Sequence, residues 1–75
     1  MTIKQFEKYI KSIGFSNLDK TNVYIHSHYK KYKIYSMGLN YFLYIDDKIM
    51  DRCVIDDLRP LKQIEIGYKL KNILG

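Results

Sequence analysis

The sequence of 75 residues contains one cysteine, Cys53. An internal disulfide is therefore excluded, and a lone thiol is typical of proteins in a reducing compartment, so we expect a cytoplasmic location. No run of about 20 apolar residues occurs, and the sequence predicts no membrane-spanning helix. The first residues interleave charged and apolar side chains, unlike a signal peptide.

Tryptophan and alanine are also absent, whereas tyrosine occurs eight times and 47% of the residues are hydrophobic. This apolar content favours a globular fold over disorder. The length predicts one small domain over residues 1–75, with little core to stabilise it. Tyrosine has an apolar body and a polar tip, which suits half-buried strands and interfaces. A chain this short, with no disulfide, would gain stability from a second subunit, and we expect a homodimer.

Charge is distributed in blocks along the chain. The formal net charge is +5, yet residues 20–37 contain four lysines and no acid, whereas five aspartates fall between residues 46 and 57. A protein that coats nucleic acid uniformly would not need the acidic block.

The pattern at the N-terminus predicts a helix over residues 3–13. Thr2 and Gln5 fit a capping box, and Gly14 is suited to the left-handed residue that ends a helix. Apolar side chains follow at helical spacing and predict the buried face of this helix: Ile3, Phe6, Ile10 and Ile13.

After a polar stretch predicted as a loop, residues 16–21, the period changes to two. This predicts antiparallel strands over residues 22–28, 33–37, 41–45 and 49–55, and a final helix from Pro60 to residue 74 that is either continuous or broken at Gly67. The predicted class is α+β: a sheet of three or four strands with both helices on one face. We expect the first helix to pack on Val23, Ile25 and Ile34, and on a stripe of the last helix that runs from Leu61 to Ile73.

Few residues have the spacing that chemistry requires. His26 and His28 share a strand face and could chelate a metal, but a structural zinc site needs four ligands, and two half-exposed histidines are the simpler interpretation. Asp46 and Asp47 fit a turn. Asp56 and Asp57 fit a helix cap. Cys53 has no base at a recognisable spacing. The sequence therefore predicts no enzyme, no metal and no cofactor.

The segment from Tyr24 to Tyr35, YIHSHYKKYKIY, combines aromatic and basic side chains without an acid. Tyrosine is enriched at protein interfaces, and alternating aromatics and lysines also suit stacked bases and phosphates. A solvated hairpin is the simpler alternative, and the acidic side from Asp46 to Asp57 is the other candidate surface. The predicted partner-binding residues are Tyr24, His26, His28, Lys30, Lys31, Tyr32, Lys33 and Tyr35.

The opening FEKYIKSIGF, the tyrosine-rich middle and the ending DDLRPL…KLKNILG resemble small proteins encoded by phages and other mobile elements of bacteria with AT-rich genomes. Such proteins often bind a host or defence protein, as anti-CRISPR proteins do. The resemblance implies a protein that binds, and may inhibit, a bacterial partner. The alternative is a small basic nucleic-acid-binding protein that uses the same tyrosine- and lysine-rich face.

Overall fold

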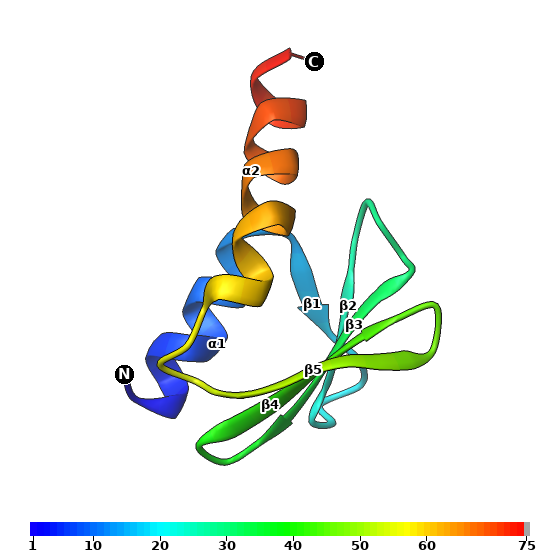
Figure 1. The fold of residues 1–75 in the computed structure, drawn as a ribbon. Helices are drawn as coiled ribbons and strands as arrows, with labels where there is room; N and C mark the ends of the chain where they lie inside the picture. Colours follow the sequence, from blue (N-terminus) through cyan, green and yellow to red (C-terminus); the bar gives the residue numbers. More distant parts are fainter. Residues whose placement is uncertain (75) are drawn as a thin grey trace.

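The computed structural model describes residues 1–74, and Figure 1 shows an N-terminal helix, an antiparallel sheet and a C-terminal helix. The predicted α+β class is confirmed, but the sheet has five strands instead of three or four. The elements are α1 (Ile3–Ser12), β1 (Phe15–Asn17), β2 (Val23–His26), β3 (Tyr32–Met37), β4 (Asn40–Ile45), β5 (Lys48–Val54) and α2 (Arg59–Leu74). Within the described residues, no helix is long and apolar enough to cross a membrane.

The strands form a meander, in which every strand pairs with the next one along the chain. The additional strand is β1, of which Ser16 and Asn17 were predicted to be loop. Its Phe15 lies opposite His26 and its Asn17 opposite Tyr24. Three residues are too few for a period of two to be recognised in the sequence. The strand forms because the edge of β2 is available for pairing.

Two-residue turns close the hairpins on either side of β4. Gly38 has a φ of +59° in the first, and Asp46 and Asp47 have φ values of +52° and +65° in the second. Two successive positive φ values are those of a type I′ turn, whose twist matches that of the flanking strands. The predicted turn role of Asp46 and Asp47 is confirmed.

Helix α1 begins as predicted. Thr2 Oγ1 accepts from the Gln5 backbone N–H (3.1 Å), and Gln5 Oε1 accepts from the Thr2 backbone N–H (2.8 Å). These reciprocal bonds satisfy two N–H groups that the first turn leaves free. Phe6 and Ile10 are fully buried, whereas Ile3, predicted to be core, is exposed because the first turn lies at the rim of the sheet.

Both helices pack on the same face of the sheet, as predicted. The core joins α1 and α2 to the side chains that β2, β3 and β4 direct toward them. Its buried hydrophobic members are Phe6, Ile10, Ile13, Phe15, Tyr24, Ile34, Tyr41, Leu43, Ile55, Leu61 and Ile64.

The prediction that Val23 and Ile25 belong to the core is wrong, because β2 turns its other face to the helices. Tyr24 and His26 lie inside, while Val23 and Ile25 are half-buried on the opposite side. Both faces of β2 carry side chains with apolar bodies, so alternation alone could not distinguish them.

Helix α2 continues through Gly67 without a break. Its Leu61 and Ile64 are buried, but Ile73, which was predicted on the same stripe, is exposed together with Ile66 and Leu70. Figure 1 shows that the C-terminal turns of α2, coloured orange to red, extend past α1.

The first testable prediction concerns the core. Ile10 is fully buried at the centre of the cluster, so Ile10→Ala should lower the free energy of unfolding by about 2–5 kcal/mol through lost burial and the cavity left behind. The measurement is a urea or thermal melt followed by circular dichroism. The control is Ile3→Ala, at an exposed position on the same helix, which should melt close to wild type; equal melts for the two variants would contradict the structure.

Candidate functional site

The eight residues predicted to bind a partner do not form one surface. Tyr24 and His26 have relative exposures of 4% and 0% and belong to the interior, so the prediction of an accessible role for them is wrong. His28, Lys30, Lys31 and Tyr32 lie in and beside the loop between β2 and β3. Lys33 and Tyr35 lie on the far face of the sheet from the helices.

The imidazole of His26 can be buried because both of its ring nitrogens have backbone hydrogen-bond partners. Its Nε2 lies 2.8 Å from the Ile13 carbonyl oxygen, at the end of α1. Its Nδ1 accepts the backbone N–H groups of His28 (3.1 Å) and Tyr29 (3.0 Å). Since Nδ1 accepts two N–H groups, the proton is on Nε2, which donates to Ile13. Burial lowers the pKa of this histidine, so the ring is neutral at neutral pH.

Neither ring nitrogen of His26 is free to bind a metal, so His26 and His28 do not form a chelating pair. Within the described residues, no group of three or more His, Cys, Asp or Glu side chains is placed to hold a metal ion. The Cys53 thiol is half-buried, and burial raises its pKa, which keeps it protonated.

Aromatic rings pack around His26 and attach the loop between β2 and β3 to α2. The Tyr68 ring of α2 lies 5.3 Å from the rings of His26 and His28, measured between centroids. Tyr29 stacks on His26 at 5.0 Å, and Lys71 Nζ lies 5.5 Å from the Tyr29 centroid. This part of the YIHSHYKKYKIY segment therefore serves first to join the loop to the helix.

The side of the sheet that faces away from the helices, here called the outer face, carries a continuous array of aromatic and apolar side chains. Cross-strand pairing arranges it in rows. One row runs Val23, Tyr35, Phe42, Arg52 across four strands. The next runs Ile25, Lys33, Tyr44, Ile49, and a shorter third runs Met37, Asn40, Val54.

Contacts within the outer face hold its aromatic side chains in place. The rings of Tyr35 and Phe42 lie 6.2 Å apart between centroids, and the Arg52 guanidinium lies 5.7 Å from the Phe42 centroid. Lys33 Nζ pairs with Asp47 Oδ1 at 3.2 Å. Around these residues, Met37, Ile49 and Val54 are 51%, 60% and 52% exposed. The face is thus apolar with isolated positive charges.

Sequence reasoning found Lys33 and Tyr35 but missed the rest of the outer face. The sequence pattern predicts Val23 and Ile25 as core residues, and it predicts Phe42, Tyr44 and Arg52 only as members of strands. The alternation in residues 40–45 was a usable signal: Phe42 and Tyr44 have to lie on the opposite side from Tyr41 and Leu43. Which side the helices cover decides which pair is exposed.

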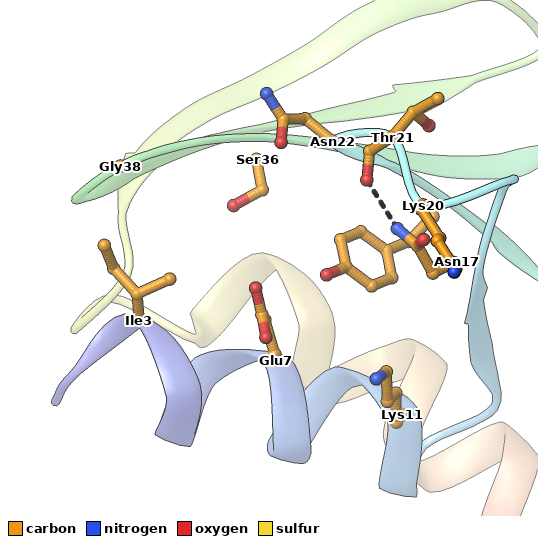
Figure 2. Close-up of a pocket in the computed structure, with 10 residues that line it drawn as sticks. Ile3, Glu7, Lys11, Asn17, Lys20, Thr21, Asn22, Ser36 and Gly38 are labelled. Atoms are coloured by element: carbon orange, nitrogen blue, oxygen red, sulfur yellow. Dashed lines mark hydrogen bonds between the residues drawn. The ribbon is translucent and has the colours of Figure 1, made fainter.

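A second candidate is a cleft of about 480 Å³ between α1 and the loop that joins β1 to β2. Figure 2 shows Glu7 and Lys11 projecting from α1 below Asn17 and Thr21, with the bond from Asn17 Nδ2 to the Thr21 carbonyl oxygen (2.6 Å) drawn as a dashed line. Tyr24 lines the cleft on its sheet side. Burial, and then the nearby Glu7 carboxylate, raise the pKa of the Tyr24 hydroxyl. The Tyr24 hydroxyl therefore stays protonated and cannot serve as a base at neutral pH.

The acidic side between residues 46 and 57 is used structurally. Asp57 Oδ1 accepts the backbone N–H of Arg59 (3.2 Å) at the start of α2, and its carboxylate also pairs with the Arg59 guanidinium (2.8 Å). These hydrogen bonds lower the pKa of Asp57 to about 2. The predicted role of Asp57 at the helix start is confirmed.

Comparison of the chain with protein families, with curated proteins and with solved structures gave no match. The case for a functional surface therefore depends on geometry, and the outer face is the strongest candidate.

The second testable prediction concerns His26 and pH. Because the pKa of His26 is lower in the folded protein than its ordinary value of 6.5, the unfolded chain binds a proton first as the pH falls. The free energy of unfolding should therefore decrease below about pH 6.5, well above the range in which carboxylates titrate.

The measurement is urea unfolding at about pH 7.5 and about pH 5.5. A His28→Gln variant is the control and should keep the decrease, since the buried imidazole is His26. A stability that is equal at the two pH values would show that His26 is not held neutral.

The third testable prediction concerns Gly14, which has a φ of +107° and lies against the His26 ring. A Cβ at this position would lie 2.5 Å from His26 Nε2, so Gly14→Ala should displace the ring and lower the melting temperature strongly. The control is Gly38→Ala, which also has a positive φ, of +59°, but has no atom within 4 Å of the added Cβ. Gly38→Ala should lower the free energy of unfolding by only about 1–2 kcal/mol, because of backbone strain. Equal losses in the two variants would contradict the role of the ring contact.

Proposed function

We propose that the chain is a non-enzymatic binding protein that docks onto a protein partner through its outer face. The observation that supports this is an apolar sheet surface that no helix of residues 1–74 covers. An antiparallel sheet with one wet face normally alternates apolar residues inside with polar residues outside. Here the outer positions of β2 to β5 are apolar or aromatic except for Lys33, Asn40 and Arg52.

The composition of the outer face suits a protein surface as partner. Tyrosine and arginine are the residue types that most often dominate binding energy at interfaces, and they act where surrounding apolar contacts exclude water. Tyr35 on β3 and Arg52 on the edge strand β5 flank Phe42 on β4, with Met37, Ile49 and Val54 around them. The resemblance to mobile-element proteins suggests a bacterial host or defence protein, such as a CRISPR component, as the partner to be inhibited.

Nucleic acid is the second candidate, supported by the adjacent rings of Tyr35, Phe42 and Tyr44 beside Lys33 and Arg52. Bases can stack on such rings while cations neutralise phosphates. Two features favour protein instead. Lys33 is already paired with Asp47. The apolar side chains of Val23, Ile49 and Val54 occupy positions where a phosphate-binding surface would need lysine or arginine.

The fourth testable prediction separates the two candidates. A Tyr35→Thr, Met37→Thr, Val54→Thr variant removes apolar contacts from the outer face, and threonine is compatible with strands. All three positions are exposed, so the variant should fold with a melting temperature near that of wild type. Wild type should capture a partner protein from a nuclease-treated bacterial lysate, and the threonine variant should not. The measurement is a comparison of the captured proteins by mass spectrometry.

The matched control is Lys30→Thr, Lys31→Thr, at the exposed tip of the loop between β2 and β3, which should retain capture. Capture that disappears on nuclease treatment, with log affinity for a single-stranded oligonucleotide falling steeply with log salt, would support the nucleic-acid candidate. Equal capture by wild type and the threonine variant would refute a role for the outer face.

A further inference from the structure

Helix α2 is apolar on two opposite sides. Leu61 and Ile64 are buried against the sheet, and Tyr68 packs on the histidines of the loop between β2 and β3. Successive residues of an α-helix are about 100° apart, so Ile66 and Ile73 lie roughly 180–200° from Ile64. Ile66, Leu70 and Ile73, here called the α2 stripe, therefore point away from the fold.

No side chain of residues 1–73 covers the α2 stripe. Ile66 and Leu70 are each 52% exposed and Ile73 is 77% exposed. A surface helix that needs only its core contacts would carry polar residues on the opposite side. The three side chains are spaced i, i+4 and i+7, the spacing of the anchors by which an amphipathic helix enters a groove on another protein.

The charges beside the α2 stripe are positive. Glu65 is the single acid of α2, and its carboxylate is already engaged by Lys69 Nζ (2.8 Å), by Lys62 Nζ (3.5 Å) and by the Tyr9 hydroxyl. The hydrogen bonds from Lys69 and Tyr9 lower the pKa of Glu65 to about 2. Two lysines thus share one carboxylate and leave a net positive charge along one edge of the stripe.

We infer that the α2 stripe is a second docking surface, which inserts into an apolar groove rimmed by carboxylates on a partner protein. A groove can enclose Ile66, Leu70 and Ile73 from both flanks and bring acids to Lys62 and Lys69. This surface lies on α2, apart from the outer face, and the inference does not depend on the proposed function.

Three other occupants fit the observations less well. A second copy would present the same lysines, and two convex helices touch along a narrow line, well short of the roughly 800 Å² per partner of a stable interface. Three side chains offer a bilayer no more hydrocarbon than a single acyl chain, which by itself binds only marginally. A helix that binds in a DNA groove needs polar side chains to hydrogen-bond with base edges, and the α2 stripe has isoleucine and leucine at those positions.

The probe for a test is a designed two-helix hairpin with a leucine groove flanked by glutamates, and a matched hairpin has lysines in place of the glutamates. Titration of the isotope-labelled full chain, followed by NMR, should show the glutamate hairpin shifting the resonances of Ile66, Leu70 and Ile73. Leu70→Ser should weaken binding about tenfold or more, the typical loss for a central anchor.

Asn72→Ser is the matched control, because Asn72 is exposed on the same helix away from the α2 stripe, and this variant should bind like wild type. The outer-face threonine variant should also bind like wild type, so failure of this inference and failure of the proposed function are distinguishable. Absence of binding at millimolar hairpin, equal binding of the lysine hairpin, or shifts confined to the outer face would overturn the inference.

Two further measurements assign the stripe to another occupant and would equally overturn it. Sedimentation showing a wild-type dimer that Leu70→Ser dissociates would indicate a second copy. Flotation with vesicles of phosphatidylcholine and phosphatidylglycerol that Leu70→Ser abolishes would indicate an anionic membrane.

Discussion

The buried imidazole of His26 is the contact on which the arrangement of the other elements depends. It joins the Ile13 carbonyl at the end of α1 to the backbone N–H groups that begin the loop after β2. Gly14 leaves room for the ring, and Tyr68 of α2 packs on its edge. An unpaired polar group at this depth would be costly, so the hydrogen bonds of both nitrogens hold the end of α1 against β2 and the loop that follows it, and the Tyr68 ring adds α2 by packing.

This contact also determines which side of the sheet is left uncovered. With His26 directed toward the helices, Tyr24 follows it inward because side chains alternate along a strand. Val23 and Ile25 then lie outside, where pairing with β3 places them beside Tyr35 and Lys33. The outer face is therefore a consequence of the same hydrogen bonds that close the core, and its apolar character results from which residues remain after the core is filled.

Both helices lie on one side of the five-stranded sheet, so no helix covers the other side. The core takes its apolar residues mainly from α1, α2 and one side of the strands, and many of the other apolar residues of the strands and of α2 lie on the outer face and on the α2 stripe. Large exposed apolar patches are uncommon on small monomeric proteins and mark interaction sites. The two proposed docking surfaces lie on different elements of the fold, one on the sheet and one on α2.

Much of the local structure was predictable from the sequence. The capping box of Thr2 and Gln5, the turn at Asp46 and Asp47, and the cap at Asp57 each depend on residues within a few positions of one another, and such interactions form wherever the chain is placed. The helix period was equally visible in α1 and the strand period in β4, whereas a bulge at Met50 interrupts the alternation of β5. The short β1 was not, because its three residues form a strand only through pairing with β2.

In β2 and α2, the side that faces inward was decided by the tertiary structure, whereas the buried face of α1 was visible in the sequence. In β2 both sides are amphipathic, and only the partners offered to His26 by α1 and the following loop distinguish them. In α2 two apolar stripes compete, and the sheet contacts the one that contains Leu61 and Ile64 while Ile66, Leu70 and Ile73 stay exposed. Apart from β1, the elements and the α+β class follow from local periodicity and caps, which the sequence displays directly. Which apolar side chains became core and which became candidate interfaces was decided by long-range packing, because burial depends on neighbours that are distant in the chain.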